Sequence, residues 1–161
     1  MVWLMASPSP KVSVIVPTHN RADLIEYSIR SVLAQTYPDF ELLVVDNGST
    51  DSTRSVVDGI GDPRIRYIYQ ENSGGPAGPR NTGIRESRGE YVAFLDSDDL
   101  WVPTKLARQV EVLEKRPAVG LVYGQFTRFS ECGNTVSDPI PTLENARSGE
   151  VFEDLAVELV F

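Results

Sequence analysis

Four short apolar runs, separated by segments with helical spacing, constrain the fold of this chain most strongly. The runs cover residues 12–16, 40–45, 65–69 and 91–95, and the first is rich in β-branched side chains. The runs over 12–16, 40–45 and 91–95 are typical of strands that are buried on both faces of a sheet, and the run over 65–69 indicates a third strand between them in sequence. Strands that alternate with helices predict an α/β fold, a Rossmann-like, mostly parallel sheet flanked by helices.

The segments between and after these runs predict the remaining elements. Helical spacing indicates helices over 24–33 and 52–59, and another that begins at Pro103. A loop rich in Gly and Pro over 72–83 feeds a helix that reaches Ser87. Further on, we expect a hairpin from 119–129 to 135–136 and a helical stripe over 151–160. We expect residues 1–10 to be a disordered leader and residues 11–161 to form one domain.

Composition excludes several classes of protein. The 161 residues carry 15 Lys and Arg against 23 Asp and Glu, a net charge of −8, which argues against a nucleic-acid partner. The single cysteine, Cys132, and the single histidine, His19, exclude an internal disulfide and a multi-histidine metal site. No apolar run is long enough to span a bilayer. We therefore expect a cytoplasmic location, at the cytoplasmic face of the membrane if a longer protein is anchored there.

Polar motifs follow three of the predicted strands directly. They cover residues 17–20, 46–51 and 96–99. In parallel α/β sheets, ligands bind at the carboxyl ends of the strands. Three polar loops that are far apart in the sequence are therefore expected to converge on one rim of the sheet.

The motif Asp96-Ser97-Asp98-Asp99 gives the strongest single indication of a site. Carboxylates one residue apart at a strand end direct oxygens toward a hard divalent cation such as Mn²⁺ or Mg²⁺, which commonly bridges to phosphates. A cluster of acids before a helix also serves as a cap, and this interpretation stays open.

Two further motifs are open to a functional and a purely structural interpretation. In the stretch 46–51, Asp46 or Asn47 could bond a nucleobase or ribose edge, but Asn-Gly also simply forms turns. In the stretch 72–83, glycines allow a ligand close to the backbone, and Arg80 offers a fork of donors to a phosphate. The same stretch is also consistent with a mobile surface loop.

Taken together, in this order and spacing, the stretches 12–20, 46–51, 72–83 and 96–103 resemble the inverting glycosyltransferases of family 2. The resemblance covers roughly residues 11–129. It implies the GT-A fold, a nucleotide-diphosphate sugar as donor, and a divalent metal, Mn²⁺ or Mg²⁺. It also implies transfer of the sugar to an acceptor hydroxyl with inversion, as in polysaccharide, lipopolysaccharide or glycoprotein synthesis.

The resemblance also implies roles for individual residues. Pro17 and Thr18 match positions that line the nucleoside pocket, and His19 and Asn20 beside them join the expected donor-binding residues. His19 stands where an aromatic side chain is frequent in the family. Arg80 matches an arginine placed near the donor.

The acidic motifs match the family with one departure. Asp96-Ser97-Asp98 matches its Asp-X-Asp motif, so Asp98 is expected to hold the metal and Asp96 the ribose or the metal. The family often has two acids where this chain has Asp46 and Asn47. Asn47 keeps a carbonyl acceptor for an imide N–H, so a UDP- or dTDP-sugar is favoured.

The acceptor and the general base are less defined. The resemblance fits a saccharide, a lipid-linked or a protein acceptor. We expect the general base beyond residue 161. This chain would then be the donor-binding portion of a domain that is truncated at its C-terminus. A non-catalytic nucleotide-binding module is an alternative. A nucleotidyltransferase is a weaker one, because residues 17–20 contain no glycine-rich basic loop.

Overall fold

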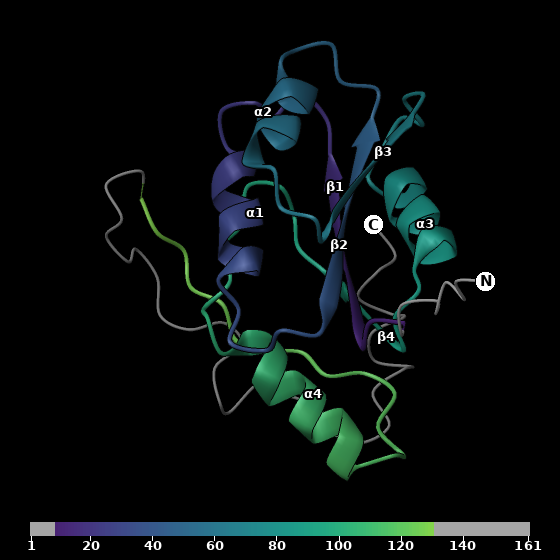
Figure 1. The fold of residues 1–161 in the computed structure, drawn as a ribbon, viewed down its shortest axis with the longest axis vertical. Helices are drawn as coiled ribbons and strands as arrows, with labels where there is room; N and C mark the ends of the chain where they lie inside the picture. Colours follow the sequence, from purple (N-terminus) through teal and green to yellow (C-terminus); the bar gives the residue numbers. More distant parts are fainter. Residues whose placement is uncertain (1–8, 131–161) are drawn as a thin grey trace, which may run out of the picture. The chain divides into compact units, whose positions relative to one another are not determined.

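Strand β1 (Val12–Thr18) lies inside a parallel four-stranded sheet in the computed structural model, which describes residues 9–130 (Figure 1). It pairs with β2 (Phe40–Asn47) on one side and with β4 (Tyr91–Phe94) on the other, and β3 (Ile65–Gln70) pairs with the far edge of β2. The order is therefore β3-β2-β1-β4. Every residue of β1 and β2 is buried, including the polar Ser13, Glu41 and Asp46. The residues of β4 are half-buried or exposed, so the prediction of a buried strand over 91–95 is wrong for residues 91–94, where β4 is paired on one side only.

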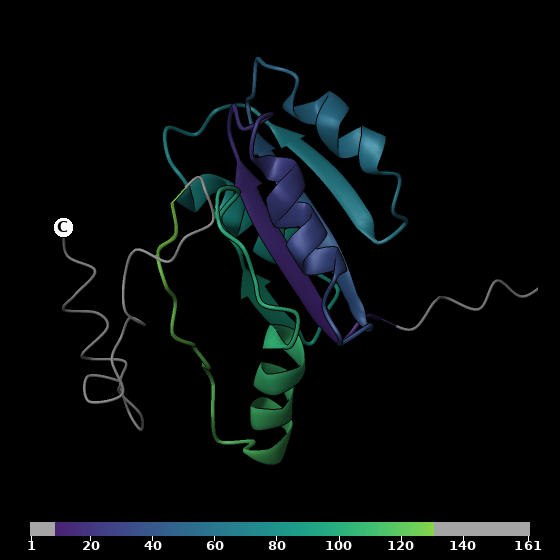
Figure 2. The same cartoon turned by 90° about the vertical axis from the view of Figure 1, so that its left-hand side faces the viewer.

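Helices cover both faces of this sheet. Helices α1 (Ile25–Leu33), α2 (Thr53–Ile60) and α4 (Lys105–Lys115) share one core with the sheet, while α3 (Ala77–Glu86) packs on β1 and β2. Figure 1 shows α1 and α2 on one side of the strands and α3 on the other, and Figure 2 looks onto α1 in front of the sheet. This arrangement confirms the predicted α/β fold.

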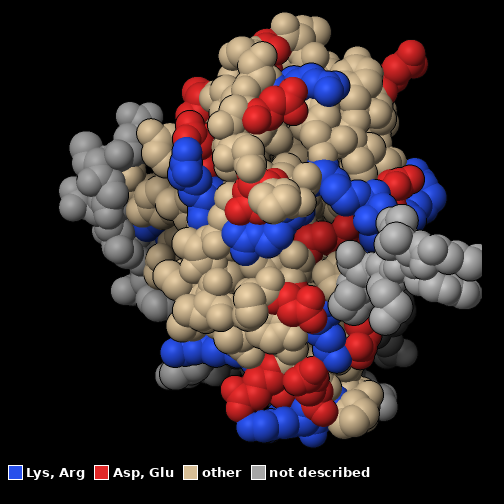
Figure 3. All heavy atoms as spheres, viewed as in Figure 1, with Lys and Arg blue, Asp and Glu red and all other residues tan. Residues whose placement is uncertain are grey.

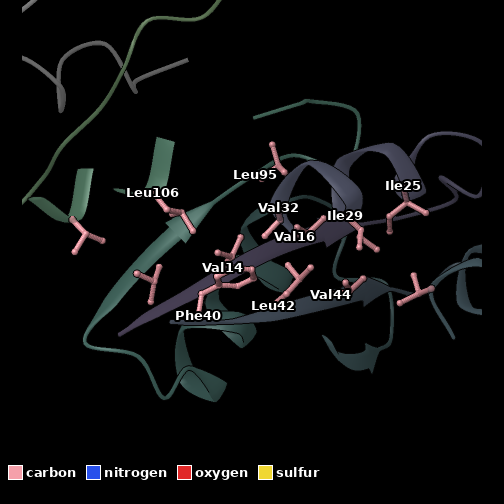
Figure 4. Close-up of a cluster of buried hydrophobic side chains, with 13 residues drawn as sticks. Val14, Val16, Ile25, Ile29, Val32, Phe40, Leu42, Val44, Leu95 and Leu106 are labelled. Carbon is pink, nitrogen blue, oxygen red and sulfur yellow. The ribbon is translucent and has the colours of Figure 1, made fainter. Parts of the chain in front are cut away.

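The core is divided between the two faces by the alternation of side chains along the strands. Val14 and Val16 of β1 meet Ile29 and Val32 of α1 in the larger cluster (Figure 4). Ile15 belongs to a smaller cluster on the α3 face, together with side chains of β2 and β3. Because successive residues of a strand point to opposite faces, one apolar run supplies both cores.

Helix α3 starts earlier than the sequence pattern predicts. It begins at Ala77, so the predicted loop over 72–83 is wrong from that residue onward. Pro79 fits because it lies in the first helical turn, where its missing N–H has no partner within the helix. Gly83 fits because a Cβ there would lie 2.5 Å from Cγ2 of Ile15, so only glycine lets the helix approach β1 this closely.

The chain divides into two compact units, residues 1–115 and 116–161, and all eight helices and strands of the described part belong to the first. Within 116–130 the structure has only isolated bridge pairings at Phe126 and Phe129, so the first arm of the predicted hairpin is not a strand. The rest of that hairpin, the predicted leader up to residue 8 and the predicted helix over 151–160 lie outside the described residues. The boundaries 1–10 and 11–161 stay a prediction. None of the helices in the described part is both long and apolar enough to cross a bilayer.

Charged side chains of both signs lie next to one another on the surface. Figure 3 shows Lys and Arg beside Asp and Glu over the face that it displays. Pairs one helical turn apart account for part of this pattern, such as Arg54 and Asp58 on α2 at 3.2 Å. Exposed pairs of this kind contribute little to stability.

Candidate functional site

A cavity of about 520 Å³ opens at the carboxyl ends of the strands. The register places Thr18 of β1 beside Asp46 of β2, and Asn47 beside Gln70 of β3, so these strands end at one edge. The volume of the cavity lies within the range of small-molecule sites. We call this cavity the strand-end cavity. Four segments of the first unit line it, and they contain the polar motifs that the sequence analysis singled out.

The segment after β1 forms one wall. Pro17, Thr18, His19 and Arg21 line the cavity. The hydroxyl oxygen of Thr18 is buried and has no hydrogen-bond partner in the structure. A buried hydroxyl without a partner is costly unless a ligand or a water supplies one. Thr18 is therefore placed to bond a polar group of a bound molecule.

Asn20 does not line the cavity but joins the loop after β1 to the loop after β2. Its backbone φ of 52° lies in the left-handed region, which asparagine tolerates better than most residues. Its backbone N–H donates to Oγ of Ser49 at 2.8 Å, and its Oδ1 accepts from the backbone N–H of Thr50 at 2.8 Å. The two loops are thus held together by direct hydrogen bonds.

Asp51 strengthens the same connection. Its carboxylate accepts hydrogen bonds from the backbone N–H of Ala22 at 3.1 Å and from that of Thr53, in the first turn of α2, at 2.9 Å. These bonds and the hydroxyl of Thr53 hold the pKa of Asp51 below its usual value, the hydroxyl contributing most. Much of the 46–51 motif therefore performs turn and capping chemistry.

Asp46 is also used inside the protein. It is buried and does not line the cavity. One carboxylate oxygen accepts from the backbone N–H of Ser49 at 2.8 Å, and the other accepts from the hydroxyl of Tyr67. Burial and the bond to Asp46 raise the pKa of Tyr67. Asp46 thus fixes the turn after β2, and its role as a donor-binding residue stays a prediction.

The loop after β3 and the start of α3 form the opposite wall. Asn72, Gly74, Gly75 and Pro76 line the cavity, and so do Pro79 and Arg80 of α3. The Nη2 atom of Arg80 lies 2.5 Å from Oδ1 of Asp96, so the helix is tied to the loop after β4. This places the predicted phosphate-binding arginine inside the cavity, next to a carboxylate.

The loop after β4 closes the cavity with Asp96, Ser97 and Asp98. Oδ2 of Asp98 lies 3.8 Å from Nη2 of Arg21. Burial and the charges of Asp98 and Asp96 together raise the pKa of the neighbouring Asp99. Asp96 and Asp98 thus each lie beside an arginine, and Asp99 adds a third acidic side chain next to them.

This wall fits a metal that is shared with a ligand. The described residues contain no group of three or more His, Cys, Asp or Glu side chains that could hold a metal. Mg²⁺ is usually held by only one or two carboxylates, together with waters and substrate phosphates, and Mn²⁺ accepts the same oxygen ligands. Asp96 and Asp98 supply such hard oxygens on one wall. The residues present therefore fit Mn²⁺ or Mg²⁺ when a phosphorylated ligand contributes the remaining oxygens.

The structure brings together most of the predicted residues and adds others. Arg21 and Asn72 line the cavity, although the sequence analysis gave neither an individual role. The signal for Asn72 was available, because β3 ends at Gln70 and the strand-end rule applies to it as well. Arg21 had no signal of its own in the sequence.

The sequence and the fold both match known proteins. The model of the family described as "Glycosyl transferase family 2" matches residues 13–154. The Escherichia coli UDP-Glc:alpha-D-GlcNAc-diphosphoundecaprenol beta-1,3-glucosyltransferase WfgD is 43% identical over 115 residues, which cover 71% of this chain and 45% of WfgD. The putative teichuronic acid biosynthesis glycosyltransferase TuaG of Bacillus subtilis is 43% identical over 114 residues, 70% of this chain and 45% of TuaG. The chain thus spans less than half the length of these curated relatives.

Solved structures give the same picture. S. aureus TarS 1-349 in complex with UDP-GlcNAc matches with a TM-score of 0.64 and 30% identity, covering 73% of this chain and 38% of the TarS 1-349 chain. The mannosyltransferase PcManGT from Pyrobaculum calidifontis, in complex with GDP-Man and Mn2+, matches with a TM-score of 0.63 and 34% identity. That match covers 80% of this chain and 39% of PcManGT. The sheet and its helices are therefore of the GT-A type.

Proposed function

Because the chain belongs to glycosyl transferase family 2, we propose that its strand-end cavity binds the nucleoside-diphosphate sugar from which a glycosyl group is transferred. The observation that carries this proposal is that one cavity has a wall with a neutral hydrogen-bonding group and a second wall with carboxylates. One wall offers Thr18, with its buried and unpartnered hydroxyl, and the other offers the carboxylates of Asp96 and Asp98.

The first wall suits the nucleoside. Pro17 and His19 line the cavity together with Thr18, and their rings offer surfaces against which a flat base can lie. The hydroxyl of Thr18 both donates and accepts, so it can bond a polar edge of the base or ribose. Asn20 supports this wall from behind, through its bonds to the loop after β2.

The second wall suits the diphosphate. Arg80 and Arg21 supply guanidinium groups, which bond phosphate oxygens in a fork geometry. Asp98, with Asp96, would hold Mn²⁺ or Mg²⁺ against the phosphates. When bound, the cation would neutralise negative charge on the departing diphosphate. Ser97, between the two carboxylates, is buried and lines the same wall.

Two of the relatives support a uridine nucleotide, whereas PcManGT is described with GDP-Man. TarS is described in complex with UDP-GlcNAc, and WfgD is named for UDP-Glc as donor. The name of WfgD also gives a lipid-linked acceptor, GlcNAc-diphosphoundecaprenol. We propose a UDP-sugar donor and a lipid-linked saccharide acceptor for this chain, with dTDP-sugars and other acceptors as the alternatives. Such an acceptor would bring the reaction to a membrane surface, which we propose to be the cytoplasmic face.

Inversion at the sugar and the general base belong to the same proposal. An inverting transfer requires a base that removes the proton of the acceptor hydroxyl. We assign no described residue to this step, since the carboxylates that line the cavity are used for the metal and for Arg80.

Calorimetric titration of the chain with UDP, dTDP and GDP, each with and without Mn²⁺, tests the proposal. We expect UDP to bind, and to bind more tightly with Mn²⁺. In Asp98→Asn the effect of Mn²⁺ should fall by about tenfold or more, because even a residue that only orients a metal ligand is worth that much. Asp58→Asn is the matched control, since Asp58 is exposed on α2 and does not line the cavity. Unchanged metal dependence in Asp98→Asn would contradict the metal assignment.

A further inference from the structure

We infer that Asn47 is a positioning residue that fastens the loop over residues 72–75 to the end of β2 and does not read the base of a bound nucleotide. The inference rests on the proposed function only in its second half. The first half concerns the architecture of the cavity, because this loop forms one of its walls.

The carbonyl of Asn47 has no capacity left for a ligand. Asn47 lines the strand-end cavity, but it is buried, with 4% of the residue exposed. Its Oδ1 accepts three hydrogen bonds, from Nε2 of Gln70 at 2.8 Å, from the backbone N–H of Ser73 at 3.0 Å and from the hydroxyl of Ser73 at 3.0 Å. A carbonyl oxygen has two lone pairs, so three donors already exceed its usual capacity.

The orientation of the Asn47 amide follows from one of these donors. The backbone N–H of Ser73 can only donate, so the oxygen of Asn47 must face it and the NH₂ group must point the other way. There the NH₂ group lies 3.4 Å from Oδ1 of Asn72 and 3.4 Å from the carbonyl of Gly75. Both are acceptors, so each side of the amide faces groups of the complementary kind.

The loop is held along its whole length by this arrangement. Asn72 accepts a bond from the backbone N–H of Gly74 at 2.8 Å, which closes the loop on itself. Ser73 also touches the start of α3, where a Cβ on Gly78 would lie 2.0 Å from Oγ of Ser73. Removing the Asn47 amide would therefore loosen a wall of the cavity rather than delete a single contact with a ligand.

This role differs from the one that the family resemblance implies. A residue that reads a uracil imide supplies an acceptor, and aspartate in place of Asn47 would supply one at least as well. A residue that fastens the loop must also donate, toward Asn72 and Gly75. Aspartate keeps the bond to Ser73 but sets an oxygen against those two acceptors, so Asn47→Asp should loosen the loop partly and Asn47→Ala more.

Amide hydrogen exchange of the ligand-free chain, measured residue by residue, tests the fastening. We expect exchange at Ser73 and Gly74 to rise about tenfold or more in Asn47→Ala, and by less in Asn47→Asp. Thr18→Val is the matched control, because Thr18 lines the same cavity and its hydroxyl bonds nothing in the structure. Exchange at Ser73 that stays at the parent rate in Asn47→Ala, while that variant is folded, would overturn the inference. If Asn47→Ala does not fold, Asn47→Asp decides alone, and parent-like exchange there counts against the inference.

Titration of the parent chain, Asn47→Ala and Asn47→Asp with UDP, CDP and GDP tests whether Asn47 reads the base. A positioning role predicts that Asn47→Ala weakens all three nucleotides by a similar factor and keeps their order. A changed order, with loop exchange unchanged, would make Asn47 a base reader and refute the inference. If the parent chain binds none of the nucleotides, the proposed function fails, whereas the exchange result still decides whether Asn47 fastens the loop.

Discussion

Replacing Glu41 by glutamine should destabilise the fold far more than the loss of a surface charge does. Glu41 lies on β2, and its side chain is 9% exposed. One carboxylate oxygen accepts from the hydroxyl of Ser13 at 2.7 Å and from the backbone N–H of Arg88 at 2.8 Å, and the other accepts from Nη1 of Arg66 at 2.9 Å. The carboxylate thus ties three strands to the segment that follows α3.

The size of the effect follows from these three donors. Glutamine keeps one acceptor oxygen, so at least one buried donor is left facing an NH₂ group, at about 1–3 kcal/mol. The bond to Arg66 also loses its charge assistance. Arg66 keeps Glu86 as a second partner at 3.3 Å and is 26% exposed, so the loss stays below that of a fully buried pair. We expect a total of about 2–4 kcal/mol.

Urea unfolding at pH 7 measures this loss, with Glu86→Gln as the matched control. Glu86 pairs with the same Arg66, but its side chain is 51% exposed, so its loss should cost less than about 1 kcal/mol. A Glu41→Gln variant that is no less stable than Glu86→Gln would refute the reasoning.

The pH dependence gives a second check on Glu41. Burial alone would raise its pKa, but the hydrogen bonds from Ser13, Arg66 and Arg88 outweigh burial and hold the pKa below its ordinary value of 4.5. A carboxyl whose pKa is lower in the folded chain stabilises the fold at pH values above its ordinary pKa. This stabilisation is lost as the pH falls through the pKa of the folded chain. The gap in stability between parent and Glu41→Gln should therefore narrow below about pH 4.5.

Two further predictions concern a glycine and a lysine. In Gly83→Ala the new Cβ would lie 2.5 Å from Cγ2 of the buried Ile15, so urea unfolding should show a loss of about 1–3 kcal/mol. Gly59→Ala in α2, where nothing lies within 4 Å, should gain about 0.5–1 kcal/mol, and a similar gain in Gly83→Ala would contradict the close packing. Burial lowers the pKa of Lys105, whose Nζ lies 3.9 Å from the ring centroid of Trp101, to about 8. Between about pH 8 and 10.5 the unfolded chain therefore binds a proton at Lys105 that the folded chain does not bind. The free energy of unfolding should rise with pH over this range in the parent, and it should rise less in Lys105→Met. Equal dependence of the unfolding free energy on pH in the two proteins would exclude the lowered pKa of Lys105.

The strands were predictable from the sequence because their signal is local. A buried strand in a parallel sheet needs mostly apolar side chains on both faces, and the runs ending at Val16 and Val45 meet that need except at the buried Ser13 and Glu41. The start of α3 was not predictable, because Gly78 and Gly83 weaken the helical pattern. Glycine is required at these two positions because Ser73 leaves no room for a Cβ at residue 78 and Ile15 leaves none at residue 83. These contacts join residues that the sequence does not show to be neighbours.

The site was predictable in its location and less so in its details. The strand-end rule correctly brings Thr18 and Asp98 to one cavity. It does not tell which polar side chains face a ligand and which bond their neighbours. Asp46 is a carboxylate at a strand end like Asp96, yet its partner is the hydroxyl of Tyr67, from a strand whose register the sequence does not reveal.

The two neighbours of β1 come from very different distances along the chain. The bond from Ser13 to Glu41 spans 28 residues, whereas that from Lys11 to Glu90 spans 79. Closing the longer loop costs about 0.9 kcal/mol more in chain entropy. During synthesis from the N-terminus, β1, β2 and β3 all precede β4, so their residues are available for pairing before those of β4. Because β4 leads directly into the loop with Asp96 and Asp98, the acidic wall is the last part of the strand-end cavity to be synthesised.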